Sequence, residues 1–154
     1  MANVYLCSAQ RTPIGGFNGF FSSVGAVELA GNAIRAAFTE AKLDAVDEVL
    51  MGCVLPAGLG QAPARQATFA AGLGAEIPAT TLNKMCGSGM KTTMMAYDQI
   101  ALGHADVMIA GGMESMTNAP YLLSDSAQGR DWVTDRLGTI CFWTGWKTPM
   151  TKDG

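Results

Sequence analysis

Cys86 is the residue of this chain whose type and setting best suit chemistry. It stands in the stretch NKMCGSG at positions 83–89, between an expected strand and an expected long helix. The first N–H groups of a helix lack partners within the helix and carry the positive end of its dipole, so they favour a thiolate. Glycines after the cysteine let a substrate carbonyl approach the backbone closely. Cys86 is therefore a candidate nucleophile for acyl transfer, with N–H groups directed at a developing oxyanion. On these residues alone, a structural role is the alternative.

The other three cysteines, Cys7, Cys53 and Cys141, are expected to be small core residues. No CxxC pair occurs, and the chain has one histidine, His104, so we expect no metal site. His104 follows Gly103 at an expected helix end. A capping or surface role suits it better than the role of a base for Cys86.

The remaining residues that could have a function also have common structural explanations. The pair Gly111 and Gly112 could cradle a phosphate, but a tight turn from strand to loop is the more frequent cause. We expect Arg65, Gln66 and Glu114 to be solvated at loop edges. Several of the ten methionines are expected to fill the core: Met85, Met90, Met94, Met95 and Met108.

Size and composition indicate one soluble globular domain, since the 154 residues are 49% hydrophobic and 15% charged. The net charge of −3 and scattered basic residues argue against nucleic-acid binding. The N-terminus lacks a basic region followed by an apolar stretch, and no apolar run approaches the ~18 residues of a membrane span. We therefore predict a cytoplasmic protein with reduced thiols and no membrane contact.

Hydrophobic patterns predict strands alternating with helices. Strands are expected at residues 3–9, 47–55, 78–83 and 105–110, the last entering a turn at 111–116. Helices are expected at 26–42, at 64–73 with Gly74 near the C-cap, and at 88–102 closed by Gly103. This alternation favours a mainly parallel sheet, whose ligands gather at the C-terminal ends of the strands. Cys86 and the glycine pair should then lie at one edge.

Four stretches together resemble the N-terminal part of the thiolase family, closest to its acetyl-CoA acetyltransferase (acetoacetyl-CoA thiolase) branch. They are RTPIG at 11–15, GQAPARQ at 60–66, LNKMCGSGMK at 82–91 and AGGMESM at 110–116. The resemblance covers roughly residues 4–123. Ketosynthases that build fatty acids share the fold and a nucleophilic cysteine. The residues around Cys86 and the stretch at 111–116 resemble those of thiolases instead.

The resemblance implies an α/β fold: a thiolase-like N-terminal domain over residues 1–123, with a mixed, mainly parallel sheet and helices on both faces, incomplete relative to a full thiolase. It implies an acyltransferase that condenses two acetyl-CoA to acetoacetyl-CoA, or catalyses the reverse thiolysis. Cys86 would carry the acetyl group as a thioester, and its backbone N–H would form part of the oxyanion hole. No permanently bound cofactor is implied, because the coenzyme A thioester is the substrate. A homo-oligomer is implied through the strand from Ala79 to Lys84.

In the family, a histidine that activates the nucleophile and a second cysteine come from a C-terminal half. Neither His104 nor Cys141 lies in a matching motif, so neither receives these roles. Most contacts to coenzyme A also follow Leu123, so we assign no coenzyme-binding residues. We expect little or no activity from this chain alone. The alternative is a non-catalytic dimerising fragment; a generic cysteine hydrolase would need a histidine motif that this sequence lacks.

Residues 124–154 contain all three tryptophans and no clear periodicity. Reading each codon's last base with the first two of the next codon allows the string DHMFLDGLEDAYDKGR from Gly138 onward, which resembles thiolase sequence of this region. We therefore predict that 124–154 is a tail outside the family, arising from a shift of reading frame and poorly ordered. The alternative is a short isoform with its own tail.

Overall fold

The central element is a three-stranded parallel sheet of order β2-β1-β3. The computed structural model describes residues 3–123 and 137–139, with side chains over residues 3–121. The strands are β1 (Glu48–Gly52), β2 (Ala79–Leu82) and β3 (Met108–Gly112). Val49 pairs with Ala79 on one side and with Ile109 on the other. The parallel sheet confirms the predicted architecture, and β1 is its central strand.

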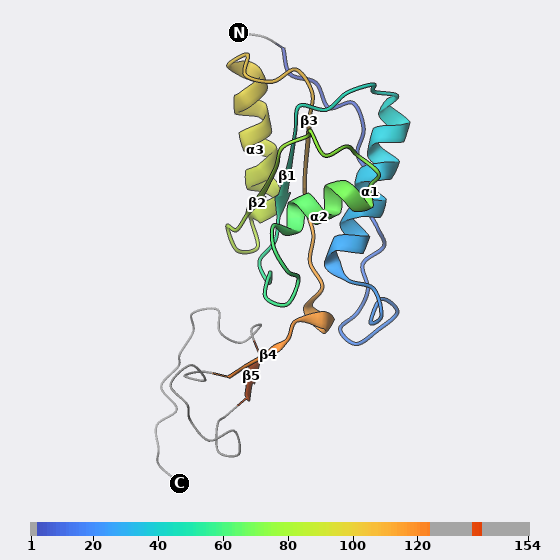
Figure 1. Ribbon diagram of the computed structural model, residues 1–154, viewed down its shortest axis with the longest axis vertical. Coiled ribbons are helices and arrows are strands. Elements are labelled where there is room, and N and C mark those ends of the chain that lie inside the picture. Colours follow the sequence, from blue (N-terminus) through green and yellow to red (C-terminus); the bar gives the residue numbers. More distant parts are fainter. Residues whose placement is uncertain (1–2, 124–136, 140–154) are drawn as a thin grey trace.

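Helices cover both faces of this sheet (Figure 1). On one face lies α3 (Ser88–Ala101), and on the other lie α1 (Ala26–Ala41) and α2 (Pro63–Ala70). The core under α1 and α2 contains Val49 and Met51 of β1. Because successive strand residues point to opposite faces, the alternate residues Leu50 and Gly52, also buried, face α3.

Small residues bring α1 and α2 close together. A Cβ added to Gly31 of α1 would lie 2.6 Å from the Cβ of Ala70 in α2. The first turn of α2 is held from the sheet, since the N–H of Ala64 donates to Thr81 Oγ1 at 2.9 Å. This bond satisfies one of the N–H groups that a helix start leaves without an internal partner.

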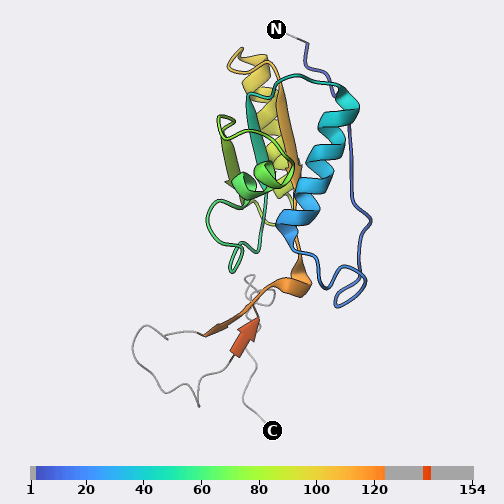
Figure 2. The ribbon, with the colours of Figure 1, turned by 45° about the vertical axis from the view of Figure 1, so that its right-hand side comes forward.

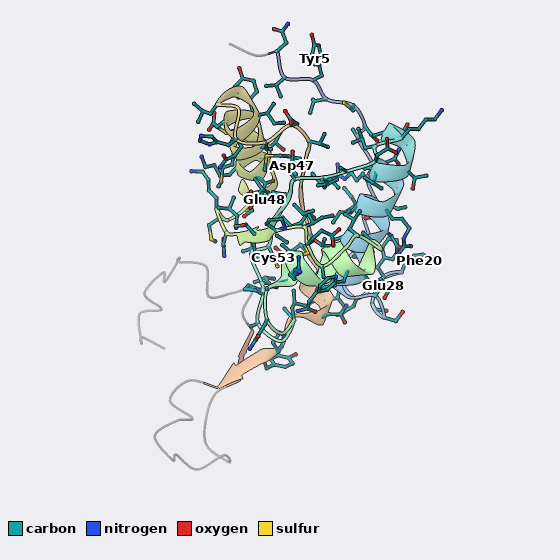
Figure 3. All side chains as sticks on the ribbon, turned by 45° about the horizontal axis from the view of Figure 1, so that its top comes forward. Tyr5, Phe20, Glu28, Asp47, Glu48 and Cys53 are labelled. Carbon is teal, nitrogen blue, oxygen red and sulfur yellow. The ribbon has the colours of Figure 1, made fainter. Side chains whose placement is uncertain are left out.

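The segment 3–9 is not a strand, contrary to the sequence prediction. It runs along the outside of α1 (Figure 2), where Ser8 Oγ and Gln10 Nε2 both donate to Glu40 Oε2. Tyr5 is 74% exposed and Leu6 88% exposed, and Figure 3 shows Tyr5 projecting from the body. A strand needs a neighbour for its backbone groups, and no strand of the described residues pairs with this segment.

The other predicted elements are present with shifted ends. The helices at 26–42, 64–73 and 88–102 correspond to α1, α2 and α3, and the strands at 47–55 and 78–83 to β1 and β2. The turn after α2 uses Gly72 at φ 87°, rather than Gly74, as its left-handed glycine.

The predicted strand at 105–110 begins later, at Met108, and includes Gly111 and Gly112. Asp47 Oδ2 accepts the N–H groups of Asp106 and Val107 at 2.7 and 2.9 Å, so a side chain takes the place of a strand partner there. The glycine pair therefore belongs to the sheet and is not the predicted turn.

Three of the five methionines assigned to the core are instead on the surface. Met85, in the turn before α3, is 47% exposed. Met90 is 72% exposed and Met94 is 54% exposed, and Tyr97 on the same side of α3 is 53% exposed. These three residues of α3 recur at i, i+4 and i+7, the spacing of one helix face. We call them the outer stripe of α3.

The chain leaves the sheet through a short 3-10 helix at Met116–Asn118 and enters β4 (Tyr121–Leu123), which pairs antiparallel with β5 (Leu137–Thr139). β5 lies within the tail that the sequence analysis sets apart. The remaining tail residues lie outside the described ones, so poor order there stays a prediction. None of the helices in the described part of the chain has the length and hydrophobicity to cross a bilayer.

Candidate active site

Cys86 lies immediately before the N-cap of α3, as the sequence predicts. Gly87 is the N-cap residue, and the Cys86 side chain is exposed. The turn that joins β2 to α3 is short, so the cysteine stands where the C-terminal ends of the strands meet a helix start. Cys86 thus lies at the positive end of the α3 dipole.

An open pocket of about 540 Å³ lies in front of Cys86. Its walls come from the ends of β1 and β3 and from the start of α3. The lining residues are Arg11, Gly52, Val54, Leu55, Met85, Cys86, Ser88, Gly89, Gly112, Met113, Glu114 and Met116. Cys86 and Gly112 thus share one edge of the sheet, which confirms that sequence prediction.

Hydrogen bonds define the turn around Cys86. The N–H of Gly87 donates to the Lys84 carbonyl at 3.1 Å, and the N–H of Ser88 donates to the Met85 carbonyl at 3.0 Å. The N–H of Cys86 takes no part in the bonds formed among the described residues. It is therefore available to donate to another group, as a donor of an oxyanion hole must be.

Glycines allow α3 to approach the sheet closely at the pocket. A Cβ added to Gly112 would lie 3.3 Å from the Gly89 Cα. Thr92, fully buried, donates to the Gly89 carbonyl at 2.7 Å and lies 2.9 Å from the Gly111 carbonyl oxygen. The glycine pair thus serves helix packing beside the pocket.

Glu114 is a structural anchor rather than the solvated residue that was predicted. Its Oε2 accepts the N–H of Val54 at 2.8 Å, and its Oε1 accepts the N–H of Leu55 at 3.1 Å. These two residues follow β1, so Glu114 ties the end of β1 to the end of β3. The partners lie 60 and 59 residues away in sequence, which is why no local pattern indicated them.

Arg65 and Gln66 are likewise bonded, contrary to the solvated reading. The Arg65 guanidinium donates to the carbonyls of Ile77 and Ala75. Gln66 Nε2 donates to the carbonyls of Leu59 and Gln61, both at 2.7 Å. The stretch at 60–66 therefore holds loops in place.

Cys53 is buried in the core, as predicted, with 1% of its surface exposed. Burial, and then the negative charge of Glu114, raise the pKa of the Cys53 thiol to about 11. Cys7 is exposed, so its assignment to the core is wrong. Cys141 lies outside the described residues.

His104 lies at the far end of α3 from Cys86. The helix has 14 residues, which at 1.5 Å per residue separates its ends by roughly 20 Å. His104 is exposed, and its Nδ1 lies 3.0 Å from Gln99 Oε1. It is a surface residue near the helix end, and it does not reach the pocket of Cys86.

A second pocket of about 400 Å³ adjoins the first along residues 112–116. Its other walls come from residues 10–17, Phe21 and α1. Arg11 lines both pockets, so the stretch at 11–15 contributes to the region of the site. Within the described residues, no group of three or more His, Cys, Asp or Glu side chains could hold a metal ion.

Comparisons with known proteins agree with this arrangement. The family model for the thiolase N-terminal domain matches residues 4–146. The chain belongs to the thiolase family, which confirms the resemblance and the fold class. A solved structure, the Acat5 thiolase from Ascaris suum in complex with coenzyme A, superposes with a TM-score of 0.82 at 35% identity, covering 88% of this chain and 35% of that one.

Curated relatives share about half of their aligned residues with this chain. Mitochondrial acetyl-CoA acetyltransferase B of Xenopus laevis is 54% identical over 126 residues, covering 80% of this chain and 30% of the relative. Acetyl-CoA acetyltransferase of Escherichia coli K12 is 49% identical over an alignment of 163 residues, covering 99% and 41%. The chain thus spans between about a third and two fifths of these relatives' length. Since one relative is mitochondrial, the cytoplasmic location stays a prediction.

Proposed function

We propose that this chain supplies the nucleophile of a thiolase-type acyltransferase. In this proposal Cys86 takes an acetyl group from acetyl-CoA or acetoacetyl-CoA. The observation that carries the proposal is an exposed cysteine at the start of α3, facing a pocket of about 540 Å³. The names of the curated relatives, acetyl-CoA acetyltransferases, support this class of substrate.

In the acyl-transfer step, the Cys86 thiolate attacks the thioester carbonyl of acetyl-CoA. A bond forms between Sγ and the carbonyl carbon, and negative charge develops on the carbonyl oxygen. The N–H of Cys86, unused within the turn, donates to that oxygen. The carbon–sulfur bond to coenzyme A then breaks, the coenzyme A thiolate takes a proton from water, and acetyl-Cys86 remains.

Condensation requires a second acetyl-CoA to lose a proton from its methyl group. The resulting enolate attacks the acetyl-Cys86 carbonyl, Cys86 leaves as a thiolate, and acetoacetyl-CoA is formed. The chain's one histidine, His104, lies roughly 20 Å from the thiol by helix length. We therefore propose that acyl transfer to Cys86 is the step this chain supports. A base for condensation comes from outside its described residues.

Incubation with acetyl-CoA followed by mass spectrometry tests this function. We expect one acetyl group on the peptide containing Cys86, and none in the Cys86→Ser variant. Cys7→Ser is the matched control, because Cys7 is the other exposed cysteine among the described residues, and it should leave the labelling of Cys86 unchanged. Labelling of Cys7 at the same rate as Cys86, or no adduct at Cys86, would contradict the proposal.

A non-catalytic dimerising fragment is the second candidate, favoured by one observation. β2 pairs only with β1 among the described strands, so its other edge presents unpaired backbone groups that a second copy can use. The segment from Ala79 to Lys84 would form this interface. Retained dimerisation without acetyl-Cys86 would support the fragment over the acyltransferase.

A further inference from the structure

Three polar side chains near Cys86 have no part in the acyl-transfer step described above. They are Asn83, Ser88 and Glu114, and none of them is hydrogen-bonded to the Cys86 thiol. All three instead bond to backbone groups at the end of β1 or in the turn before α3. Asn83 and Ser88 therefore hold the turn itself, and Glu114 holds the segment after β1 to which the turn is bonded.

The turn has one strained residue, Met85, directly before the nucleophile. Its φ of 49° lies in the left-handed region, which favours glycine and is costly for a residue with a long side chain. The direction of the next peptide, and so of the Cys86 N–H and thiol, follows from this conformation. Such a conformation persists only where the surroundings hold it.

Asn83 and Ser88 hold the backbone of Met85 from both sides. Asn83 Oδ1 accepts the N–H of Met85 at 2.9 Å, an Asx turn. Ser88 Oγ donates to the Met85 carbonyl at 2.6 Å and accepts the N–H of Lys84 at 2.9 Å. Ser88 is only 5% exposed, so water does not readily compete for these bonds.

Hydrogen bonds also connect the turn before α3 to the ends of β1 and β3. Asn83 Nδ2 donates to the Val54 carbonyl at 3.3 Å, and the N–H of Val54 donates to Glu114 Oε2 at 2.8 Å. A continuous series of hydrogen bonds therefore runs from Glu114, after β3, through Val54, after β1, to Asn83 and Met85. It follows the wall of the pocket that Cys86 faces.

We propose that Glu114, Asn83 and Ser88 are positioning residues that keep Met85 left-handed and thereby direct the thiol and N–H of Cys86 into the pocket. This inference rests on the proposed function, since it concerns the same nucleophile. It assigns these residues no contact with the reacting atoms. Misplacement of a reacting group by about 1 Å can cost roughly 100-fold in rate, so partial loosening of the turn should be measurable.

The test is the rate of Cys86 alkylation by iodoacetamide in the full chain, followed by peptide mass across the pH range of thiol ionisation. We expect Asn83→Ala to lower the rate constant roughly tenfold, and Ser88→Ala to lower it in the same direction. Glu114→Ala should lower it also, and Glu114→Gln, which keeps one acceptor oxygen, should restore part of the loss. Urea unfolding of each variant gives its native fraction.

The matched control is Asn118→Ala, because Asn118 also bridges loops, donating to the Val24 carbonyl at 3.0 Å and to Ser115 Oγ at 2.9 Å. It should change stability without slowing Cys86 alkylation. A second comparison separates positioning from general stabilisation. In a Met85→Gly background the left-handed conformation has little cost, so Asn83→Ala should slow alkylation less than it does with Met85 present.

Alkylation rates of native Asn83→Ala and Glu114→Ala within twofold of the wild type would overturn the inference. An equal slowing by Asn118→Ala would also overturn it. If instead the variants slow alkylation but acetyl-CoA never labels Cys86, the positioning role stands and the proposed function fails. If acetyl-CoA labels the wild type and all variants at equal rates, the function stands and the positioning role fails.

Discussion

Gly52 and Ser88 are in direct contact where β1 ends and α3 begins. A Cβ added to Gly52 would lie 2.6 Å from the Cβ of Ser88 and 2.7 Å from its carbonyl carbon. The first turn of α3 therefore rests on the backbone of β1, and the height of Cys86 above the sheet depends on the absence of a side chain at Gly52.

Gly52→Ala should move the start of α3 away from β1, because backbone atoms cannot give way as a flexible side chain can. We expect a loss of about 1–3 kcal/mol in the free energy of unfolding and slower alkylation of Cys86. Gly16→Ala is the control, since no atom lies within 4 Å of its added Cβ. Equal stability of the two variants in urea would contradict this account.

Cys53 should make stability fall at alkaline pH. Its pKa rises from an ordinary value of 9.0 to about 11 in the folded chain, so the folded state keeps the proton that the unfolded state loses. The contribution of the protonated Cys53 thiol to the free energy of unfolding is fully present below pH 9. It decreases as pH rises towards 11, by about 2 kcal/mol at pH 11. Urea unfolding over this range measures it. Cys53→Ala should remove this part of the slope, and an unchanged slope would disprove the assignment.

The Arg65 side chain should contribute to stability through the loop before β2. Its guanidinium bonds the carbonyls of Ile77 and Ala75 and lies 4.5 Å from the centre of the Phe69 ring. We expect Arg65→Ala to cost about 2 kcal/mol. Phe69→Leu keeps the hydrogen bonds and should cost less, about 0.5–1 kcal/mol. An unchanged urea midpoint for Arg65→Ala would exclude the role.

The free edge of β2 allows a direct test of dimerisation. The carbonyls of Pro78 and Leu82 accept hydrogen bonds from β1 or the residue after it. Because successive residues of a strand direct their N–H and C=O groups to opposite edges, those of Ala79 point away from β1. Ala79→Pro removes an outward donor and should shift sedimentation towards the monomer. Thr80→Ala, which changes only a side chain bonded to Glu48, should leave it unchanged. A dimer unaffected by Ala79→Pro would exclude this edge.

Resequencing the coding region tests the prediction of a shifted reading frame after Leu123. We expect an inserted or deleted base between the codons of about Leu123 and Asp131, and a corrected frame that encodes thiolase-like sequence there. The family match reaches residue 146, beyond that boundary. A gene that encodes residues 124–154 as given would refute the prediction.

Local sequence patterns predicted the helices and strands whose type follows from the spacing of their own apolar residues. The helix at 26–42 followed from apolar spacing, and the apolar run at 47–55 predicted a strand because β1 is buried on both faces. The segment 3–9 carries similar apolar residues, yet a strand exists only beside a partner. Apolar composition alone does not supply one.

The site was predictable in its nucleophile and not in its supports. Cys86 was located because glycines and a helix start follow it directly in sequence. Glu114 was missed because its partners lie about 60 residues away. The turn at Met85 did have a local signal, since an asparagine two residues earlier can form an Asx turn.

The outer stripe of α3 is an exposed apolar surface through which copies of this chain should associate. Met90, Met94 and Tyr97 present apolar side chains on the side of the helix away from the sheet, and contiguous exposed apolar side chains promote self-association. Association through this surface is distinct from pairing through β2, because it depends on methionine. Mild peroxide converts thioethers into polar sulfoxides, so oxidation should disperse aggregates held by α3 while leaving a strand-paired dimer intact.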